Sequence, residues 1–440
     1  MIDATLDKIN RFVPQKWQWI LSHSGFRKYF KNTGWMMIAR ILSLAISFVT
    51  TIFVARSLGP ENYGQLSYAV SFVGLFSFIA TLGIDQILFR DLVKYPEKRS
   101  TYLGSSFLMR VLAGLVTMII CCITTLLINK DVISNILIFI IASTFIFNAF
   151  QIIIYEFQAR VQSKYPSLIS LIISITLNIL KIIIIILGKG IIYLALILLL
   201  ESILYAVLYL YIYKKKLKES VFAWRYDSAV AKKILHDSWP LIVSNAFATI
   251  YARVDQVMIK NMIDASAVGL YDAAVRLTEV WYFIPGIIVS SLFPAIINAK
   301  KESDVKYVKR LRYLFLFLLF FSITISVITS VLAKPIVSIL YGPAFLGSIA
   351  VLQVYIWSNV GTAIGSLCNS YLIAENYRRI VLFSSFISMT ANIILNFFMI
   401  SRFGIVGAAW ATFISYILMS LSLFLFKESR EMVYRVIRNN

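Results

Sequence analysis

Long uninterrupted apolar runs constrain this chain more than any other feature of its sequence. The run LIISITLNILKIIIIIL at 171–187 is typical, because its apolar residues are continuous rather than alternating. Hydrophobic residues fill 60% of the 440 positions and charged residues only 14%, which is incompatible with a soluble globule. A helix that crosses a bilayer needs about 20 apolar residues, and only helices or closed barrels satisfy their backbone groups there. The sequence therefore predicts an all-α integral membrane protein.

Twelve such segments can be located along the chain. They lie near 34–56, 64–88, 104–128, 132–157, 166–187, 191–213, 239–261, 267–297, 311–333, 347–374, 379–401 and 404–426. Residues 1–30 lack an apolar core, so we expect no signal peptide ahead of the first segment. The prediction is about twelve transmembrane helices in a multi-pass protein.

The distribution of Lys and Arg supports this count and predicts the orientation. If the N-terminus is cytoplasmic, most of the 42 basic residues lie in cytoplasmic tails and connections, as the positive-inside rule requires. Each external turn then holds one: Arg56, Lys130, Lys189, Lys260, Lys334 and Arg402. Both termini are therefore expected in the cytoplasm. The formal charge of +21 then reflects topology and attraction to anionic lipid, and we expect no nucleic acid partner.

Few residues are available for catalysis or metal binding. The chain has two histidines and three cysteines, and they show no metal-ligand spacing. These are His23, His236, Cys121, Cys122 and Cys368. No GxxxxGK[ST] phosphate-binding motif occurs, and the longest connection, 214–238, is too short to fold as a domain. We therefore expect a transporter rather than an enzyme, with no metal ion and no cofactor.

The two halves of the chain contain a weak internal repeat. IFVARSLGPENYGQLSYAV (52–70) aligns with VMIKNMIDASAVGLYDAAV (257–275), which pairs Gly64 with Gly269 and Ser67 with Asp272. Further on, SITLN aligns with SMTAN, and GIIYLA aligns with GIVGAA. Secondary transporters are often built from two related halves. Because six segments separate the halves, the predicted repeat is parallel, with a cavity between the halves.

Several strings resemble one known family over essentially the whole chain. They are ARSLGPENYGQLSYA (55–69), LGIDQILFRDL (82–92), YARVDQVMI (251–259) and VGLYDAAVRLTEVWYFIP (268–285). Together they resemble the polysaccharide transporter family, which contains the Wzx-type flippases of O-antigen and capsule repeat units. That family belongs to the MOP superfamily, together with MATE exporters and MurJ-type lipid II flippases. The resemblance implies two six-helix lobes in a MATE-like V, with a cavity lined mainly by the first, second, seventh and eighth helices.

The expected organisation follows from the segments and the resemblance. It comprises a cytoplasmic tail (1–33), an N-lobe (34–213), a cytoplasmic linker (214–238), a C-lobe (239–426) and a cytoplasmic C-terminal tail (427–440).

Basic residues within or beside the cavity helices are candidates for binding a diphosphate. They are Arg40, Arg253, Arg276, Arg56 and Lys260. A charge inside a span costs roughly 2.5 to 3.5 kcal/mol, so such groups face a partner or a wet cavity. A guanidinium binds phosphate oxygens bidentately and stays charged at physiological pH. The alternative is structural: Asp272 precedes Arg276 by one helical turn and would neutralise it, and Arg56 would stabilise a helix C-terminus.

Acidic and aromatic residues supply two further groups of candidates. For coupling to H⁺ or Na⁺ they are Asp255, Glu279, Asp272 and Asp85, of which Asp255 and Glu279 are favoured because they lie beside arginines on cavity helices. For stacking on sugar rings they are Tyr251, Trp281 and Tyr282. Aromatic residues near a membrane interface are more often anchors, so the second role stays one of two alternatives.

The resemblance implies a specific function. It is translocation of undecaprenyl-diphosphate-linked oligosaccharide repeat units from the cytoplasmic to the external leaflet, by alternating access, for O-antigen (lipopolysaccharide), capsular or exopolysaccharide assembly. The expected location is the bacterial inner (plasma) membrane. Expected partners are the lipid-linked oligosaccharide, membrane lipids, a polysaccharide polymerase and a chain-length regulator, with the protein itself a monomer.

Two other functions remain open. A MATE-like exporter of cationic drugs would need an acidic cavity, whereas arginines match or outnumber carboxylates on the cavity helices. An integral-membrane polysaccharide polymerase or ligase would need larger external loops than the sequence offers.

Overall fold

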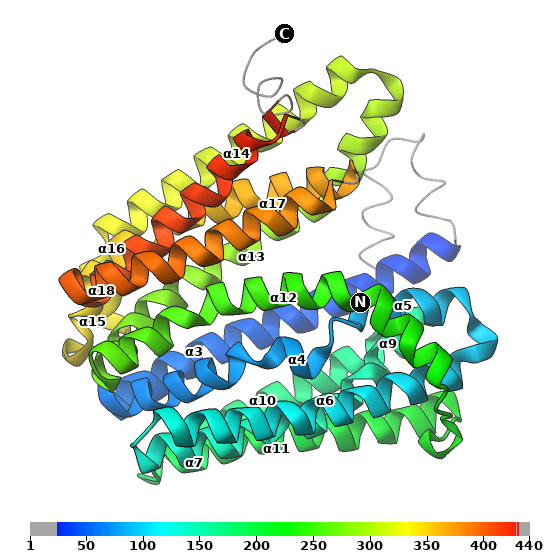
Figure 1. Ribbon diagram of the computed structural model, residues 1–440, viewed down its shortest axis with the longest axis horizontal. Helices are drawn as coiled ribbons and strands as arrows, with labels where there is room; N and C mark the ends of the chain where they lie inside the picture. Colours follow the sequence, from blue (N-terminus) through cyan, green and yellow to red (C-terminus); the bar gives the residue numbers. More distant parts are fainter. Residues whose placement is uncertain (1–23, 376, 428, 431–440) are drawn as a thin grey trace. The chain divides into compact units, whose positions relative to one another are not determined.

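The computed structural model describes residues 24–430 except 376 and 428, and within that range the chain is helical and contains no strand (Figure 1). The first half is formed by α3 (Ser24–Leu75), α4 (Ser77–Thr81), α5 (Asp85–Lys94), α6 (Arg99–Ile128), α7 (Val132–Ala142), α8 (Thr144–Asn148), α9 (Ile152–Ala159), α10 (Lys164–Ile186) and α11 (Ile191–Ile212). The second half is formed by α12 (Ser228–Met262), α13 (Ala265–Glu302), α14 (Asp304–Val331), α15 (Ala333–Leu340), α16 (Ser348–Tyr355), α17 (Ser358–Ala374) and α18 (Arg378–Ser422).

The helices agree with twelve membrane crossings. In the described part of the chain, eight helical stretches are long and apolar enough to span a membrane. Two of them, Asn32–Leu75 and Arg379–Leu425, have 44 and 47 residues, about twice the length of one crossing. Counting each of these as two, and adding α12 and the broken pair α16–α17, gives the twelve predicted segments. The predicted all-α membrane fold is confirmed.

Glycines separate the two crossings in each of the longest helices. Gly59 in α3 has φ 74° and ψ 170°, and Gly404 in α18 has φ 58° and ψ −142°. Neither conformation is helical, and a positive φ suits glycine because it lacks a Cβ. Pro60, directly after Gly59, has no N–H to continue the first helix. The Leu-Gly-Pro sequence therefore ends one crossing and begins the next.

Other segments differ in detail from the sequence prediction. The segment predicted at 64–88 is interrupted, because Leu82 and Gly83 both have positive φ angles of 52° and 57°. At the other end of the first half, α12 begins at Ser228, so the last part of the predicted linker 214–238 is helical. The Asp227 carboxylate explains that start, because its Oδ1 accepts from two backbone N–H groups of the first turn at 2.8 and 3.2 Å.

The contacts divide the chain into two compact units. Unit 1 consists of residues up to Thr51 and of Phe76–Asn245, and unit 2 of Ile52–Leu75 and the residues from Ala246 onward. Within unit 1, α6 packs on α7 and α8, and α11 packs on α7 and α10 (Figure 1). Within unit 2, α13 packs on α14, α16 and α17, and α18 packs on α16 and α17. The hairpin at 52–75 thus belongs to unit 2, although the predicted lobes placed it in the first.

Candidate functional site

Asp272 on α13 is the centre of a buried hydrogen-bond network in unit 2. Its side chain is completely buried. Tyr63 Oη and Ser67 Oγ donate to its Oδ2 at 2.6 and 2.9 Å, and Gln256 Nε2 on α12 donates to its Oδ1 at 2.6 Å. Arg276, one turn along α13, places Nε 3.3 Å from Oδ2. Both carboxylate oxygens accept bonds and a guanidinium balances the charge, so Asp272 is fully satisfied as an ionised group.

The second half of α3 and α13 cross in unit 2 at a pair of glycines. A Cβ on either Gly64 or Gly269 would overlap a backbone carbonyl oxygen of the opposite helix, so only glycine permits this approach. The sequence repeat pairs these two glycines, and it also pairs Ser67 with Asp272, which are hydrogen-bonded. Contact between equivalent residues is what a twofold relation produces on its axis. The local geometry therefore agrees with the repeat alignment at this crossing.

Asp255 on α12 is the centre of a second network, of different composition. It is 5% exposed. Tyr271 Oη and Thr412 Oγ1 each donate to its Oδ2 at 2.6 Å, and Asn396 Nδ2 donates to its Oδ1 at 2.6 Å. Asn392 extends the network, since its Oδ1 accepts from Asn396 at 3.0 Å. Among the described residues no cation pairs with Asp255, so neutral donors alone surround this buried carboxylate.

The predicted arginines on α12 and α13 have different environments. Arg276 forms ion pairs with Asp272 and, at 3.6 Å, with Glu279, so these three candidates do lie together. Arg253 is half-buried, and its Nη1 is buried without a hydrogen-bond partner in the described part of the chain. A guanidinium with an unused buried N–H group retains capacity for an anionic ligand.

Arg56 and Lys260, which were predicted at external turns, lie near helix ends. Arg56 is exposed, and its Nη1 donates to the Ile339 carbonyl oxygen, in the last turn of α15, at 3.0 Å. This is the favourable placement of a cation at a helix C-terminus, although the helix is not the one that carries Arg56. Lys260 lies half-buried in the last turn of α12.

Two candidates lie in unit 1 and therefore belong to a different body. Arg40 is an exposed residue of α3. Asp85, at the start of α5, forms an ion pair with Arg110 of α6, which is itself only 4% exposed. The Asp85 carboxylate therefore has a cationic partner, unlike Asp255.

The predicted sugar-stacking residues are engaged in contacts within unit 2. Tyr251 packs edge-on against Tyr416 with ring centroids 4.9 Å apart, and its hydroxyl donates to a backbone carbonyl of α18 at 3.3 Å. Tyr282 Oη lies 2.6 Å from Ser358 Oγ. Trp281 is half-buried. Tyr251 and Tyr282 thus have defined protein partners.

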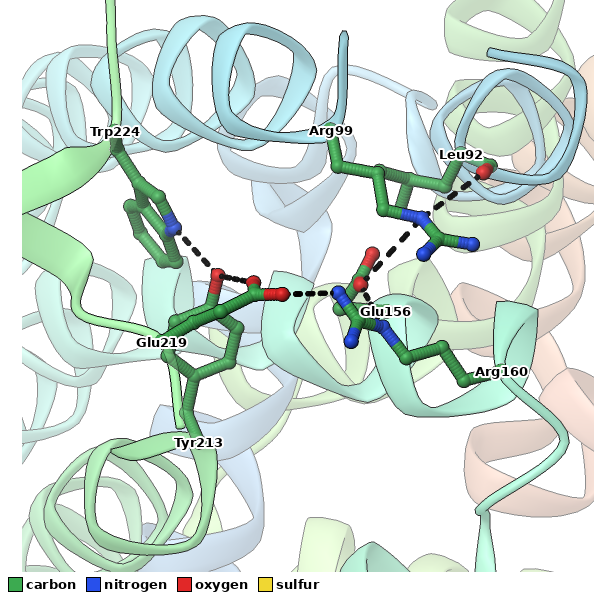
Figure 2. Close-up of polar contacts among 7 residues, drawn as sticks. All are labelled: Leu92, Arg99, Glu156, Arg160, Tyr213, Glu219 and Trp224. Carbon is green, nitrogen blue, oxygen red and sulfur yellow. Dashed lines mark hydrogen bonds and ion pairs between the residues drawn. The ribbon is translucent and has the colours of Figure 1, made fainter. Parts of the chain in front are cut away.

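A polar network in unit 1 fixes the connection between α11 and α12. Figure 2 shows its members: Leu92, Arg99, Glu156, Arg160, Tyr213, Glu219 and Trp224. Glu156 is completely buried and pairs with Arg160, which also binds Glu219 from the connection. Nearby, Arg90 donates a hydrogen bond to Asp237 at 2.6 Å and thereby holds the pKa of that carboxyl below its usual range. These contacts tie the connection to unit 1, which is a structural role.

The partners of Asp255 on α18 were not predicted from the sequence. Asn392, Asn396 and Thr412 lie on α18, far along the chain from Asp255. A signal was present, because Asn392 and Asn396 are four residues apart and therefore lie on one face of a membrane-spanning helix, where polar side chains usually have a partner.

Comparison with known proteins identifies the family. A family model described as "Polysaccharide biosynthesis protein" matches residues 29–300, which is more than half of the chain, and the MatE model matches residues 240–398. The chain belongs to the polysaccharide biosynthesis protein family. The predicted resemblance to the polysaccharide transporter family is therefore confirmed. The MatE match agrees with the predicted superfamily, which also contains the MATE exporters.

Individual relatives are distant. The probable flippase AglR of Haloferax volcanii is 27% identical over 39% of this chain, and the probable low-salt glycan biosynthesis flippase Agl15 of the same organism is 25% identical over 42%. The chain spans only 37% and 40% of their lengths. The uncharacterized membrane protein MJ1068 of Methanocaldococcus jannaschii is 22% identical over 89% of this chain and 82% of its own length.

Solved structures of transporters share the fold, and two of them are described here. The lipid II flippase MurJ in an inward closed conformation has a TM-score of 0.74 at 18% identity, covering 92% of this chain and 90% of its own. An inward-facing multidrug resistance MATE transporter of the MOP superfamily has a TM-score of 0.72 at 14% identity, covering 90% and 95%. At these identities the likeness concerns the fold alone, and that fold is the twelve-helix arrangement predicted from the sequence.

Proposed function

We propose that this protein is a flippase that moves a polyprenyl-diphosphate-linked oligosaccharide across the bacterial inner membrane during assembly of a surface polysaccharide such as O-antigen or capsule. The family membership and the description of AglR and Agl15 as probable flippases, the second in glycan biosynthesis, support a lipid-linked glycan as the cargo. The undecaprenyl carrier, both cytoplasmic termini, the polymerase and chain-length-regulator partners and the monomeric state are parts of the same proposal.

The observation that carries the proposal is the environment of Arg253. A half-buried guanidinium within a membrane span, with Nη1 buried and unpartnered, is costly unless it binds something. A diphosphate offers oxygens in the geometry that a guanidinium recognises. Arg276 would contribute less, because Asp272 and Glu279 already engage it. Arg40, Arg56 and Lys260 are assigned weaker, electrostatic roles along the path.

Asp255 supports coupling to a monovalent cation. One carboxylate surrounded by Tyr271, Thr412 and Asn396, with no cation beside it, offers a single negative charge and several neutral oxygens. Asn396 Oδ1 is buried and unpartnered within the described residues, and a half-turn of its amide would present an oxygen toward the carboxylate. Such a set suits Na⁺, which prefers oxygen ligands, and the single carboxylate would equally accept H⁺. Divalent ions are less favoured, because no cluster of three acidic, His or Cys side chains occurs in the described range.

The flippase activity is tested by reconstituting the protein in liposomes. The purified protein is placed in liposomes with a fluorescent polyprenyl-diphosphate oligosaccharide, and exposure of the glycan on the opposite face is followed with an impermeant reagent. We expect protein-dependent exposure that Arg253→Gln reduces strongly. Arg402→Gln, the matched control at an exposed position of α18, should leave it unchanged. Equal exposure by Arg253→Gln and wild type would contradict the role of Arg253, and no exposure at all would contradict the flippase.

A drug exporter is the second candidate, because the MatE model matches 240–398 and a MATE transporter shares the fold. It predicts efflux of a cationic dye from the same liposomes. Arg253 and Arg276 on α12 and α13 carry positive charge, which argues against a cationic cargo. Efflux of the dye without exposure of the glycan would favour the drug exporter.

A further inference from the structure

The connection between α11 and α12 presents one aromatic side chain to the outside. Phe222 lies in the short 3₁₀ helix η4 (Val221–Ala223) and is 96% exposed, the highest value among the large hydrophobic side chains of the described residues. Exposure of a whole aromatic ring to water is unfavourable, because removal of apolar area from water drives both folding and association. A single exposed apolar residue needs no explanation by itself, so its surroundings must decide what covers it.

The backbone around Phe222 is fixed against α6. The Arg225 N–H donates to the Ser100 carbonyl oxygen at 3.3 Å, and Ser100 Oγ donates to the Ala223 carbonyl oxygen. A Cβ on Gly104 would lie within 2.8 Å of three backbone atoms of Arg225, so the two backbones are in direct contact. The exposed position of Phe222 is therefore a defined feature of unit 1.

The connection lies beside the ends of membrane-spanning helices. The Trp224 ring packs against Phe107 with centroids 5.4 Å apart, and Phe107 lies about two turns inside the candidate span Pro96–Ile128. Trp224 Nε1 donates to Tyr213 Oη at 3.0 Å, directly after the end of α11 (Figure 2). A tryptophan with an apolar contact to a span and one polar bond is typical of the headgroup region. Phe222, two residues earlier, therefore lies close to that region.

Two lysines of the same stretch indicate the same level. Lys215 Nζ donates to Tyr211 Oη at 2.7 Å and lies 5.1 Å from the centroid of that ring, which is 54% exposed on α11. Lys216 lies 5.0 Å from the centroid of Tyr165, in the first turn of α10. Exposed tyrosines at the ends of spans form interfacial belts, and lysines beside them extend toward the headgroups. The ends of α10 and α11 thus place the membrane interface at the connection.

The charge around Phe222 is strongly positive. Residues 214–226 include five Lys and Arg side chains and one acidic residue, Glu219. The Glu219 carboxylate is already engaged by Arg160 and Tyr213, so it does not offset the exposed cations. Those are Lys214, Lys215, Lys216, Lys218 and Arg225. An exposed aromatic ring within an excess of positive charge is complementary to anionic lipid headgroups above hydrocarbon.

We propose that the connection 214–226 is an interfacial anchor, with Phe222 inserted into the bilayer surface and Lys214, Lys218 and Arg225 bound to anionic phospholipid headgroups. Because the connection is bonded to α6, the anchor holds this end of unit 1, and with it the start of α12, at a defined depth. The lipid surface is chosen over a protein partner because the neighbouring aromatic and lysine contacts already mark the interface. The anchor is independent of the cargo and of Arg253 and Asp255.

Spin labelling of the full-length protein in nanodiscs tests the anchor. The three native cysteines are replaced by alanine, and a nitroxide is attached at Phe222→Cys, where the exposed side chain makes no packing contribution. Collisions of the nitroxide with O₂, which concentrates in the bilayer, are compared with collisions with a water-soluble nickel complex. Phe320→Cys, at a 73% exposed position of α14, is the hydrocarbon reference, and Glu302→Cys, at the exposed end of α13, is the water reference.

In nanodiscs of phosphatidylcholine and phosphatidylglycerol, we expect the ratio of O₂ to nickel collisions at position 222 to lie closer to the Phe320 reference than to the Glu302 reference. Omission of phosphatidylglycerol should lower this ratio, because the attraction to anionic headgroups is lost. The combined change of Lys214, Lys218 and Arg225 to Gln should abolish that dependence on lipid charge.

Two results would overturn the proposal. A ratio at position 222 equal to the water reference would show that the ring does not enter the bilayer, and would leave this surface to a protein partner. A ratio that does not change with phosphatidylglycerol in the protein with its native basic residues would show that anionic headgroups are not bound. Neither measurement involves transport, so the anchor can fail while the proposed flippase stands, and the reverse.

Discussion

Asp255 and Asp272 are both buried carboxylates on the adjacent helices α12 and α13, yet they are satisfied in different ways. Asp272 accepts bonds from three neutral side chains and pairs with Arg276, so its charge is balanced within the protein. Asp255 has only neutral donors around it in the described part of the chain. A buried charge without a counter-charge is unstable. The difference assigns Asp272 to the architecture, and under the proposed function Asp255 is the group that a coupling cation would neutralise.

The two networks lie at consecutive positions of α12 and α13. Tyr271 of α13 binds Asp255 of α12, and the next residue of each helix forms the pair between Gln256 and Asp272. One network reaches α18 through Thr412, and the other reaches the hairpin at 52–75. The same pair of helices thus carries one carboxylate that is paired with an arginine and one that only neutral donors surround in the described residues.

The largest expected loss of stability follows removal of the fixed carboxylate. Asp272→Ala leaves Arg276 and three further donors without their acceptor, which should cost about 3 kcal/mol, the low end for a broken buried pair because Arg276 is partly exposed. The measurement is thermal unfolding in detergent. Asp255→Ala serves as the comparison and should cost less in cation-free buffer. A greater loss for Asp255→Ala would reverse the distinction between the two aspartates.

The glycine crossing beside Asp272 gives the next largest effect. Gly269→Ala inserts a methyl group into a backbone carbonyl of the opposite helix and should cost about 2 kcal/mol by overpacking. Gly286, on the same helix, has open space around the position of a Cβ. Gly286→Ala should therefore be neutral or raise stability by about 0.5 kcal/mol through helix propensity. Equal effects of the two substitutions would mean that the crossing is not close.

A single hydroxyl gives the third effect. Tyr63→Phe removes one hydrogen bond to a buried carboxylate and should cost about 1.5 kcal/mol. Tyr341 is the matched control, because it is equally buried but its hydroxyl has no partner among the described residues. Tyr341→Phe should be neutral or slightly stabilising in the same unfolding assay. Loss of stability in the control alone would contradict the network around Asp272.

Much of the architecture could be predicted from the sequence, because apolar runs of membrane-spanning length leave only helices as a solution. The turn at Gly59 and the repeat pairing of Gly64 with Gly269 were also visible as local patterns. The assignments of individual charges were harder, because ion pairing depends on side chains distant in sequence. Asp85 illustrates this, because its partner Arg110 lies on another helix, whereas the pairing of Arg276 with Asp272 one turn away was one of the two alternatives that the sequence offered. Thr412 and Asn396 are uncharged, so a search for charged residues within the spans did not find these partners of Asp255.

The position at which α16 ends could also not be predicted from the sequence. The residues at 356–357 give no sequence signal for the end of α16, since Ile and Trp are ordinary residues of an apolar helix. The position follows from tertiary contacts, such as the bond from Ser326 Oγ to the Ile356 carbonyl oxygen at 3.1 Å. Hydropathy averages over such local features, so it finds crossings and misses their interruptions.

The proposed difference between Asp255 and Asp272 is tested most directly by comparing cation-dependent stability in the wild type, Asp255→Asn and Asp272→Asn. Thermal unfolding is measured against Na⁺ at constant ionic strength, with choline as the replacement, and a parallel series varies pH. If Asp255 binds Na⁺, the wild type and Asp272→Asn gain stability with Na⁺, by about 2.7 kcal/mol at one hundred times the dissociation constant, and Asp255→Asn gains none. A response to pH alone that Asp255→Asn abolishes would identify H⁺ as the ion. A Na⁺ response that survives in Asp255→Asn, or that disappears in Asp272→Asn instead, would show that Asp255 is not the residue that binds the cation.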